Sequence, residues 1–203
     1  MNTDDKWDHL LGIRTTGRDD SRSDTYRYPY EPTPYSVLER LVSSGLIRKG
    51  NHLLDMGCGK GRVDFFIAYE TRCACTGIDF DPRMVEIAER NQLHAASGSR
   101  VRFLNRPAES YQIPDSVDRI YFFNPFSAEI LLQVLARIRE SWYNAPREII
   151  LFVYYPSFGF TEALDADPVF AADGEIDCRD LFKNEDQRER ILLYKAAKPV
   201  ETL

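Results

Sequence analysis

The stretch from Leu53 to Val63 constrains this chain most, because it joins an apolar run, one acidic residue and three glycines at alternate positions. The apolar run ends in Asp55, and the glycines are Gly57, Gly59 and Gly61. This order predicts a buried strand, a tight turn and the start of a helix. Glycine takes positive φ and lets a ligand approach the backbone, and a helix N-terminus attracts negative charge. The turn therefore suggests an anionic or carboxylate-bearing ligand, although an ordinary strand-to-helix turn would also fit.

A second acidic residue follows one strand-helix-strand unit later. Asp79 lies 24 residues after Asp55, at the end of a second apolar run, and a carboxylate at that position can accept both hydroxyls of a ribose. Asp81 and Pro82 have the chemistry of an N-cap and a first helical residue. The alternative that both aspartates are helix caps explains Asp81 well and Asp79 poorly.

These two motifs resemble those of the class I S-adenosylmethionine-dependent methyltransferases, over about residues 30–155. The first motif of that family is an apolar strand, an acidic residue and G-x-G-x-G, which here runs from Asp55 to Gly61. The fingerprint of NAD-dependent dehydrogenases, G-x-G-x-x-G, would place glycine where this chain has Arg62. An NAD-dependent oxidoreductase is therefore a weaker alternative, and a non-catalytic cofactor-binding or scaffold protein is another.

The resemblance implies which residues hold S-adenosyl-L-methionine. They are Asp55, Gly57, Cys58, Gly59, Gly61, Asp79, Phe80 and Ala108. Many family members place an aspartate for the adenine amino group just after the third strand, near where this chain has Pro107. Glu109 or the backbone of Ala108 would have to substitute for it.

The sequence Asn124-Pro125-Phe126 follows another apolar run and resembles a shortened Asn-Pro-Pro-aromatic motif of amino-group methyltransferases. The resemblance implies that all three are catalytic, with the asparagine oxygen and a proline-linked carbonyl accepting hydrogen bonds from the target nitrogen. Methyl transfer from a sulfonium needs positioning more than a strong base, whereas a hydroxyl acceptor would usually need a histidine, carboxylate or metal. We therefore expect N-methylation of an amine on a protein or small molecule, with RNA ranked lower. A turn in which Asn124 caps the next helix is the alternative.

Composition limits the partners. The net charge of −6 does not favour nucleic acid. No apolar run approaches a membrane span, and the acidic, polar start is unlike a secretory signal, so we expect a cytoplasmic protein without membrane contact. The four cysteines form no C-x-x-C pair and the three histidines are scattered, so no metal site is predicted. Oligomeric state is not readable.

The expected architecture is a single α/β domain over residues 1–203, with a three-layer Rossmann-like, seven-stranded, mostly parallel sheet and an antiparallel C-terminal hairpin strand. Residues 1–29 have no sustained apolar period, which predicts a flexible or loosely docked arm. Residues 30–49 are expected to form a leading helical lid. The nearby tyrosines, which either enclose the pocket or pack this helix on the sheet, are Tyr26, Tyr28, Tyr30 and Tyr35. The last strands are expected at 175–181 and 189–195, with a charged turn over 183–187.

Overall fold

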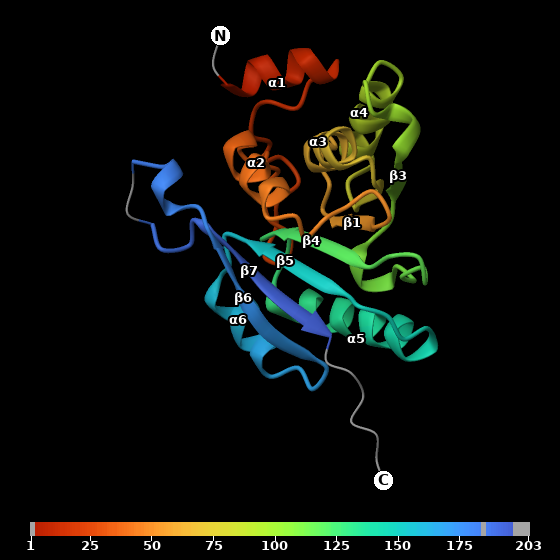
Figure 1. Cartoon of the computed structure of the whole chain (residues 1–203), viewed down its shortest axis with the longest axis vertical. Coiled ribbons are helices and arrows are strands. Elements are labelled where there is room, and N and C mark those ends of the chain that lie inside the picture. Colours follow the sequence, from red (N-terminus) through yellow and green to blue (C-terminus); the bar gives the residue numbers. More distant parts are fainter. Residues whose placement is uncertain (1–2, 184–185, 197–203) are drawn as a thin grey trace.

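The computed structural model describes residues 3–183 and 186–196 and contains one seven-stranded sheet in the order β3-β2-β1-β4-β5-β7-β6 (Figure 1). Strands β1 to β5 pair in parallel, whereas β7 is antiparallel to both β5 and β6. The strand bounds are His52–Met56 (β1), Ala74–Asp79 (β2), Val101–Asn105 (β3), Arg119–Phe123 (β4), Ile150–Tyr154 (β5), Phe170–Asp177 (β6) and Arg190–Ala196 (β7). The predicted fold class is confirmed.

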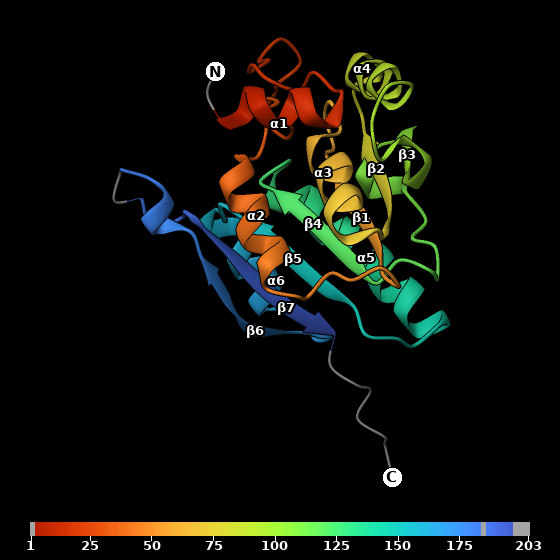
Figure 2. The same cartoon turned by 45° about the horizontal axis from the view of Figure 1, so that its top comes forward.

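Within the described ranges, six α-helices accompany the sheet: Thr3–Leu11 (α1), Tyr35–Ser43 (α2), Arg62–Thr71 (α3), Pro82–Gln92 (α4), Ala128–Asn144 (α5) and Phe158–Asp165 (α6). Residues alternate between the two faces of a strand, and two cores result. Leu53 and Tyr121 belong to the core under α2 and α3, whereas Leu54 and Phe122 belong to the core under α5 and α6. The turned view in Figure 2 shows α1, α2 and α3 together on one side of the sheet.

The strand order reverses direction at β1, which pairs with β2 on one side and β4 on the other. Ligands of open α/β sheets bind at the carboxyl ends of the strands near such a reversal. The register sets Asp55 beside Gly77 of β2 and Tyr121 of β4. The segments that follow these three strands therefore meet at one edge of the sheet.

The N-terminal segment differs from the flexible arm expected over residues 1–29. Helix α1 packs against α2 and α3, with Leu11 and Ile13 buried and the Trp7 ring 4.8 Å from that of Phe66. Residues 1 and 2 lie outside the described part of the chain. The expectation is wrong for the described part, because a short polar helix is held by contacts with residues far along the sequence.

The C-terminal third also differs in detail. Strand β6 spans Phe170–Asp177 rather than 175–181, and residues Arg179–Leu181 form a 3-10 turn. Helix α6 lies in a stretch expected to be loop, and residues 184 and 185 of the expected charged turn lie outside the described residues. Among the helices that the structure describes, none is both long enough and apolar enough to span a bilayer.

Candidate active site at the carboxyl edge of the sheet

The glycine turn after β1 is tied to β2 by backbone hydrogen bonds. The N–H groups of Gly57 and Cys58 both donate to the carbonyl of Ile78, at 2.9 and 3.0 Å, and the N–H of Gly59 donates to Asp79 Oδ2 at 2.9 Å. Gly57 and Gly61 have φ values of 90° and 85°, a region that residues with a Cβ rarely enter. The turn and the acidic end of β2 thus form one unit.

Each glycine of the turn also allows another segment to approach closely. A Cβ at Gly57 would lie 2.7 Å from Cβ of Pro125, and one at Gly59 would lie 2.2 Å from the ring of Tyr30. A Cβ at Gly61 would meet Phe103 at 2.6 Å. The turn is therefore enclosed by chain from three other segments.

A cavity of about 90 Å³ opens at this edge of the sheet. Its wall includes most of the residues predicted to bind a cofactor or substrate: Asp55, Gly57, Cys58, Asp79, Phe80, Ala108, Pro125 and Phe126. Gly59, Gly61 and Asn124, also predicted, do not line it. The two halves of the prediction, the glycine turn and Asp79, thus meet in one cavity.

Asp79 presents a fixed carboxylate to this cavity. Only 9% of the residue is exposed, and its two oxygens accept hydrogen bonds from the N–H groups of Gly59 and Asp81, each at 2.9 Å. Burial raises the pKa of Asp79 to about 6, against the lowering effect of these hydrogen bonds. Each oxygen keeps a further lone pair for a ligand hydroxyl.

Residues 19–33, here called the strap, cross the cavity and contribute to its wall. The strap is held near β4 by the Tyr28 N–H, which donates to the carbonyl of Pro125 at 3.2 Å, and by the Ser127 N–H, which donates to that of Tyr26 at 2.8 Å. At the other side, Arg27 donates to Glu109 at 2.7 Å and lies 5.0 Å from the centre of the Phe80 ring. The sequence pointed to this segment only through its tyrosines.

The tyrosines expected to form a lid do two different things: some line the cavity, and one packs in the core. Tyr28 and Tyr30 line the cavity, whereas Tyr35 is fully buried at the start of α2 and donates to Asp8 at 2.6 Å. Helix α2 itself, within the 30–49 segment, packs against α3. The strap, rather than α2, therefore covers the cavity.

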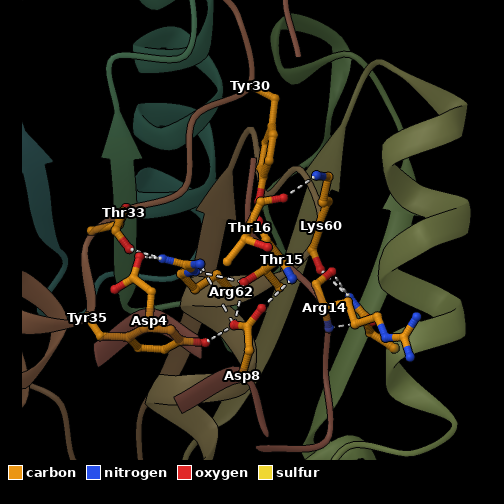
Figure 3. A network of polar contacts seen from close by, with 11 residues as sticks. Asp4, Asp8, Arg14, Thr15, Thr16, Tyr30, Thr33, Tyr35, Lys60 and Arg62 are labelled. Carbon is orange, nitrogen blue, oxygen red and sulfur yellow. Dashed lines mark hydrogen bonds and ion pairs between the residues drawn. The ribbon is translucent and has the colours of Figure 1, made fainter. Parts of the chain in front are cut away.

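The base of the strap is fastened by Arg62, the residue directly after the last glycine (Figure 3). Arg62 is 2% exposed and donates to Asp4 Oδ2 at 2.6 Å, to Thr15 Oγ1 at 2.7 Å and to the carbonyl of Thr33 at 3.3 Å. Lys60 donates to the carbonyl of Thr16 at 2.8 Å. In the sequence, Arg62 served only as evidence against a dinucleotide site. Its neighbours in the sequence do not indicate its hydrogen-bond partners.

Asn124 lies beside the cavity in an unusual backbone conformation. Its φ of 39° is positive, and its Oδ1 is buried without a hydrogen-bond partner in the described residues. The alternative that Asn124 caps the following helix is wrong, because α5 begins at Ala128 with Ser127 as its N-cap. Pro125 packs on Gly57 and lines the cavity directly.

Of the residues that the structure describes, no histidine lines the cavity. His52 lies at the start of β1, at the opposite edge of the sheet, where its Nε2 is 2.9 Å from Thr76 Oγ1. His9 and His94 lie on an outer groove between α1 and α4. Within the same described residues, no group of three or more potential metal ligands occurs.

Comparisons with known proteins agree with this geometry. The family described as a methyltransferase domain matches residues 53–142. The Saccharomyces cerevisiae protein named "Probable S-adenosylmethionine-dependent methyltransferase CRG1" is 26% identical over 183 residues, which cover 81% of this chain but only 56% of that protein. The chain thus spans little more than half of this relative.

Solved structures share the fold at low sequence identity. Magnesium protoporphyrin IX methyltransferase from Synechocystis, with bound S-adenosylmethionine, has a TM-score of 0.58 and 20% identity, over 80% of this chain and 77% of its own. An RNA methyltransferase from Salinibacter ruber, in complex with S-adenosyl-L-homocysteine, has a TM-score of 0.55 and 18% identity, over 85% of this chain and 97% of its own.

The fold and the cavity at its strand reversal define a Rossmann-like α/β protein with a nucleoside-type site. The matched range includes the glycine turn, Asp79 and the strand before Asn124. Residues 53–142 thus match a methyltransferase domain, and the chain is similar in sequence to a probable S-adenosylmethionine-dependent methyltransferase.

Proposed function

We propose that this protein binds S-adenosyl-L-methionine in the cavity and transfers its methyl group to an amine. The observation that carries the proposal is that Gly57 and Asp79 lie on the wall of the same cavity. When bound, the cofactor supplies an electrophilic methyl group. The residues of the chain then have to bind it, orient the acceptor and exclude water.

The residues on the wall fit this cofactor. The Asp79 carboxylate suits the ribose hydroxyls, and the Gly57 backbone on the cavity wall can lie against the methionine part. Asp55 lines the same cavity, and its carboxylate can pair there with a cationic amino group. For the adenine we assign Phe80 and Ala108, which also line the cavity.

The end of β4 supports an amine as the acceptor. Pro125 and Phe126 form an apolar wall there. The unpaired Oδ1 of Asn124 is buried beside this wall, and a turn of the side chain toward the cavity would let it accept a hydrogen bond from a nitrogen donor. A buried acceptor without a partner is unfavourable, so a ligand N–H that approached it would be bound favourably. A hydroxyl acceptor would need a base near Asn124. The carboxylates that line the cavity lie elsewhere: Asp55, Asp79 and Asp81 are on the cofactor side, and the others are on the strap and at Glu109. The acidic net charge favours a protein or small-molecule amine over RNA.

Replacing Asn124 tests its role in transfer. Asn124→Ala should keep the Kd for S-adenosylmethionine within about threefold while kcat falls about a hundredfold, because a lost orienting hydrogen bond acts in the transition state. Labelled cofactor incubated with fractionated lysate first identifies the acceptor fraction, and that fraction then serves as substrate. Asn144→Ala, at the exposed end of α5, is the matched control. Full activity of Asn124→Ala would remove Asn124 from the site.

A further inference from the structure

Asp64, in the first turn of α3, is a buried acidic residue that the proposed function has not used. It is 0% exposed, and neither carboxyl oxygen has a hydrogen-bond partner in the described residues when all carboxyl groups are taken as ionised. Asp55, whose Oδ2 is unpaired on the same basis, is 3% exposed and lines the cavity. A buried carboxylate with no partner is strongly unfavourable.

The two unpaired groups become partners when one of them carries a proton. The side chains of Asp55 and Asp64 lie within hydrogen-bonding reach of each other. Two carboxylates in contact in a dry interior cannot both be ionised, whereas a carboxylic acid and a carboxylate form a short, strong hydrogen bond. The arrangement therefore calls for one shared proton.

The position of the two groups indicates which of them carries it. Asp55 borders the cavity, whereas Asp64 is fully buried and lines no part of it. Burial raises the pKa of Asp64 well above its usual range, and that of Asp55 to about 7. The deeper group keeps the proton, and the group at the cavity is the one that ionises near neutral pH.

Other titratable groups around the pair come from four segments. They are Asp79 and Cys75 of β2, Cys73 just before it, Cys58 of the glycine turn, Tyr121 of β4 and Tyr30 of the strap. The pKa values of Cys58, Cys75 and the two phenols lie well above that of Asp55 because these groups are buried. The hydrogen bond with Cys75 lowers the pKa of Cys73 to about 7, and a Cys73 thiolate would further disfavour ionisation of Asp64. Asp79 likewise disfavours a second negative charge. None of these groups supplies a cation to the pair, so the hydrogen bond from Asp64 is what remains to stabilise ionised Asp55.

We propose that Asp64 is a positioning residue for cofactor binding, a neutral carboxylic acid that donates its O–H to Asp55 and holds the Asp55 carboxylate toward the cavity. This inference depends on the proposed function, because it assumes a cationic ligand at Asp55. The proton stays on Asp64 throughout. Binding selects the ionised form of Asp55, so any proton released comes from Asp55.

Two variants separate this role from simple packing. Asp64→Asn keeps the shape and an N–H donor, so its Kd for S-adenosylmethionine at pH 7 should stay within about threefold of the unchanged protein. Asp64→Leu removes the donor. The midpoint of its pH-affinity profile should then move upward by about one unit, with about fivefold weaker binding at pH 7. Titration calorimetry across a pH series measures both, and Asp115→Asn, at an exposed site, is the control.

An infrared difference spectrum gives a readout that needs no ligand. At about pH 9, where Asp55 and Asp79 are ionised, the free protein should show the carbonyl band of a protonated, buried carboxylic acid, and Asp64→Asn should lose it. This measurement also decides the matter if Asp64→Leu does not fold.

The outcomes distinguish the two proposals. If the unchanged protein does not bind S-adenosylmethionine, the proposed function fails, whatever the infrared band shows. If it binds the cofactor, the inference is overturned by a Kd change of more than about tenfold in either direction for Asp64→Asn. It is equally overturned by an unmoved pH profile in a folded Asp64→Leu variant or by the absence of the protonated-acid band.

Discussion

At the scale of single residues, Asp55 and Asp79 are carboxyl groups whose charge changes near neutral pH. Burial raises their pKa values to about 7 and about 6, whereas an unfolded aspartate titrates near 3.9. Between these values the folded protein binds more protons than the unfolded chain, so its stability falls as pH rises. The most stable free protein is therefore expected on the acidic side of neutrality.

We expect the free energy of unfolding of the ligand-free protein to fall by about 6 kcal/mol between about pH 4 and about pH 7 through these groups. Urea unfolding at a series of pH values measures this. Asp79→Asn, which cannot ionise, should show a smaller slope. A stability that rises steadily over this range, with the same slope in the variant, would mean that these carboxyl groups are not buried as described.

At the scale of elements, the glycines of the turn allow other segments to pack closely on it. Gly59 combines a φ of 52° with the Tyr30 ring against its α-carbon. Gly59→Ala should therefore destabilise the protein by about 2 kcal/mol through backbone strain and the displaced ring. Gly50→Ala is the control, because Gly50 has no positive φ and open space around it. If urea unfolding gave the two variants equal stability, the close contact of the Tyr30 ring with Gly59 would be contradicted.

The docking of the N-terminal segment depends on Arg62. Arg62→Met should weaken the docking of residues 4–33 and cost about 3 kcal/mol, because Asp8 and Thr15, both buried, lose their charged partner. Hydrogen exchange across this segment should rise in the variant. Arg102→Met, at an exposed position on β3, should leave exchange in residues 4–33 unchanged. Protection that survives in Arg62→Met would remove Arg62 as the fastening residue.

The sequence predicts those elements whose signal is local. Strands β4 and β5 are mostly apolar, and β1 and β2 carry shorter apolar stretches beside an acidic residue. Helix α4 has both its capping aspartate and its proline, and Asp81 accepts from the N–H of Arg83, as an N-cap does. Helix α1 could not be predicted in this way. Its nine residues are mostly polar, and its stability comes from Arg62 and Phe66, more than fifty residues away.

The candidate site was also predictable only where its signal is local. The turn and Asp79 follow from motif spacing, and both reach the cavity. By contrast, the contact of the Thr33 hydroxyl, 3.1 Å from that of Tyr121, has no local signal in the sequence. The place of Arg27 over Phe80 has no local signal either, since it depends on how the strap crosses the sheet.

At the scale of the whole molecule, the structure brings distant parts of the chain to one small cavity. Sites for ligands of this size usually enclose 300–1,000 Å³, whereas this cavity is about 90 Å³ with the strap in place. The glycine turn, the end of β2 and the end of β4 are fixed by the sheet, but the strap is held near them mainly by backbone hydrogen bonds and the Arg27–Glu109 pair. Binding of a cofactor therefore requires the strap to adjust.

The most direct measurement is calorimetric titration of S-adenosylmethionine into the unchanged protein and into Asp79→Ala. The account predicts saturable binding at one site, weakened about ten- to a hundredfold in the variant through the loss of charge-assisted hydrogen bonds to the ribose. Asp115→Ala should bind as the unchanged protein does. No binding by the unchanged protein, or an equal affinity of the Asp79 variant, would contradict the assignment of this cavity.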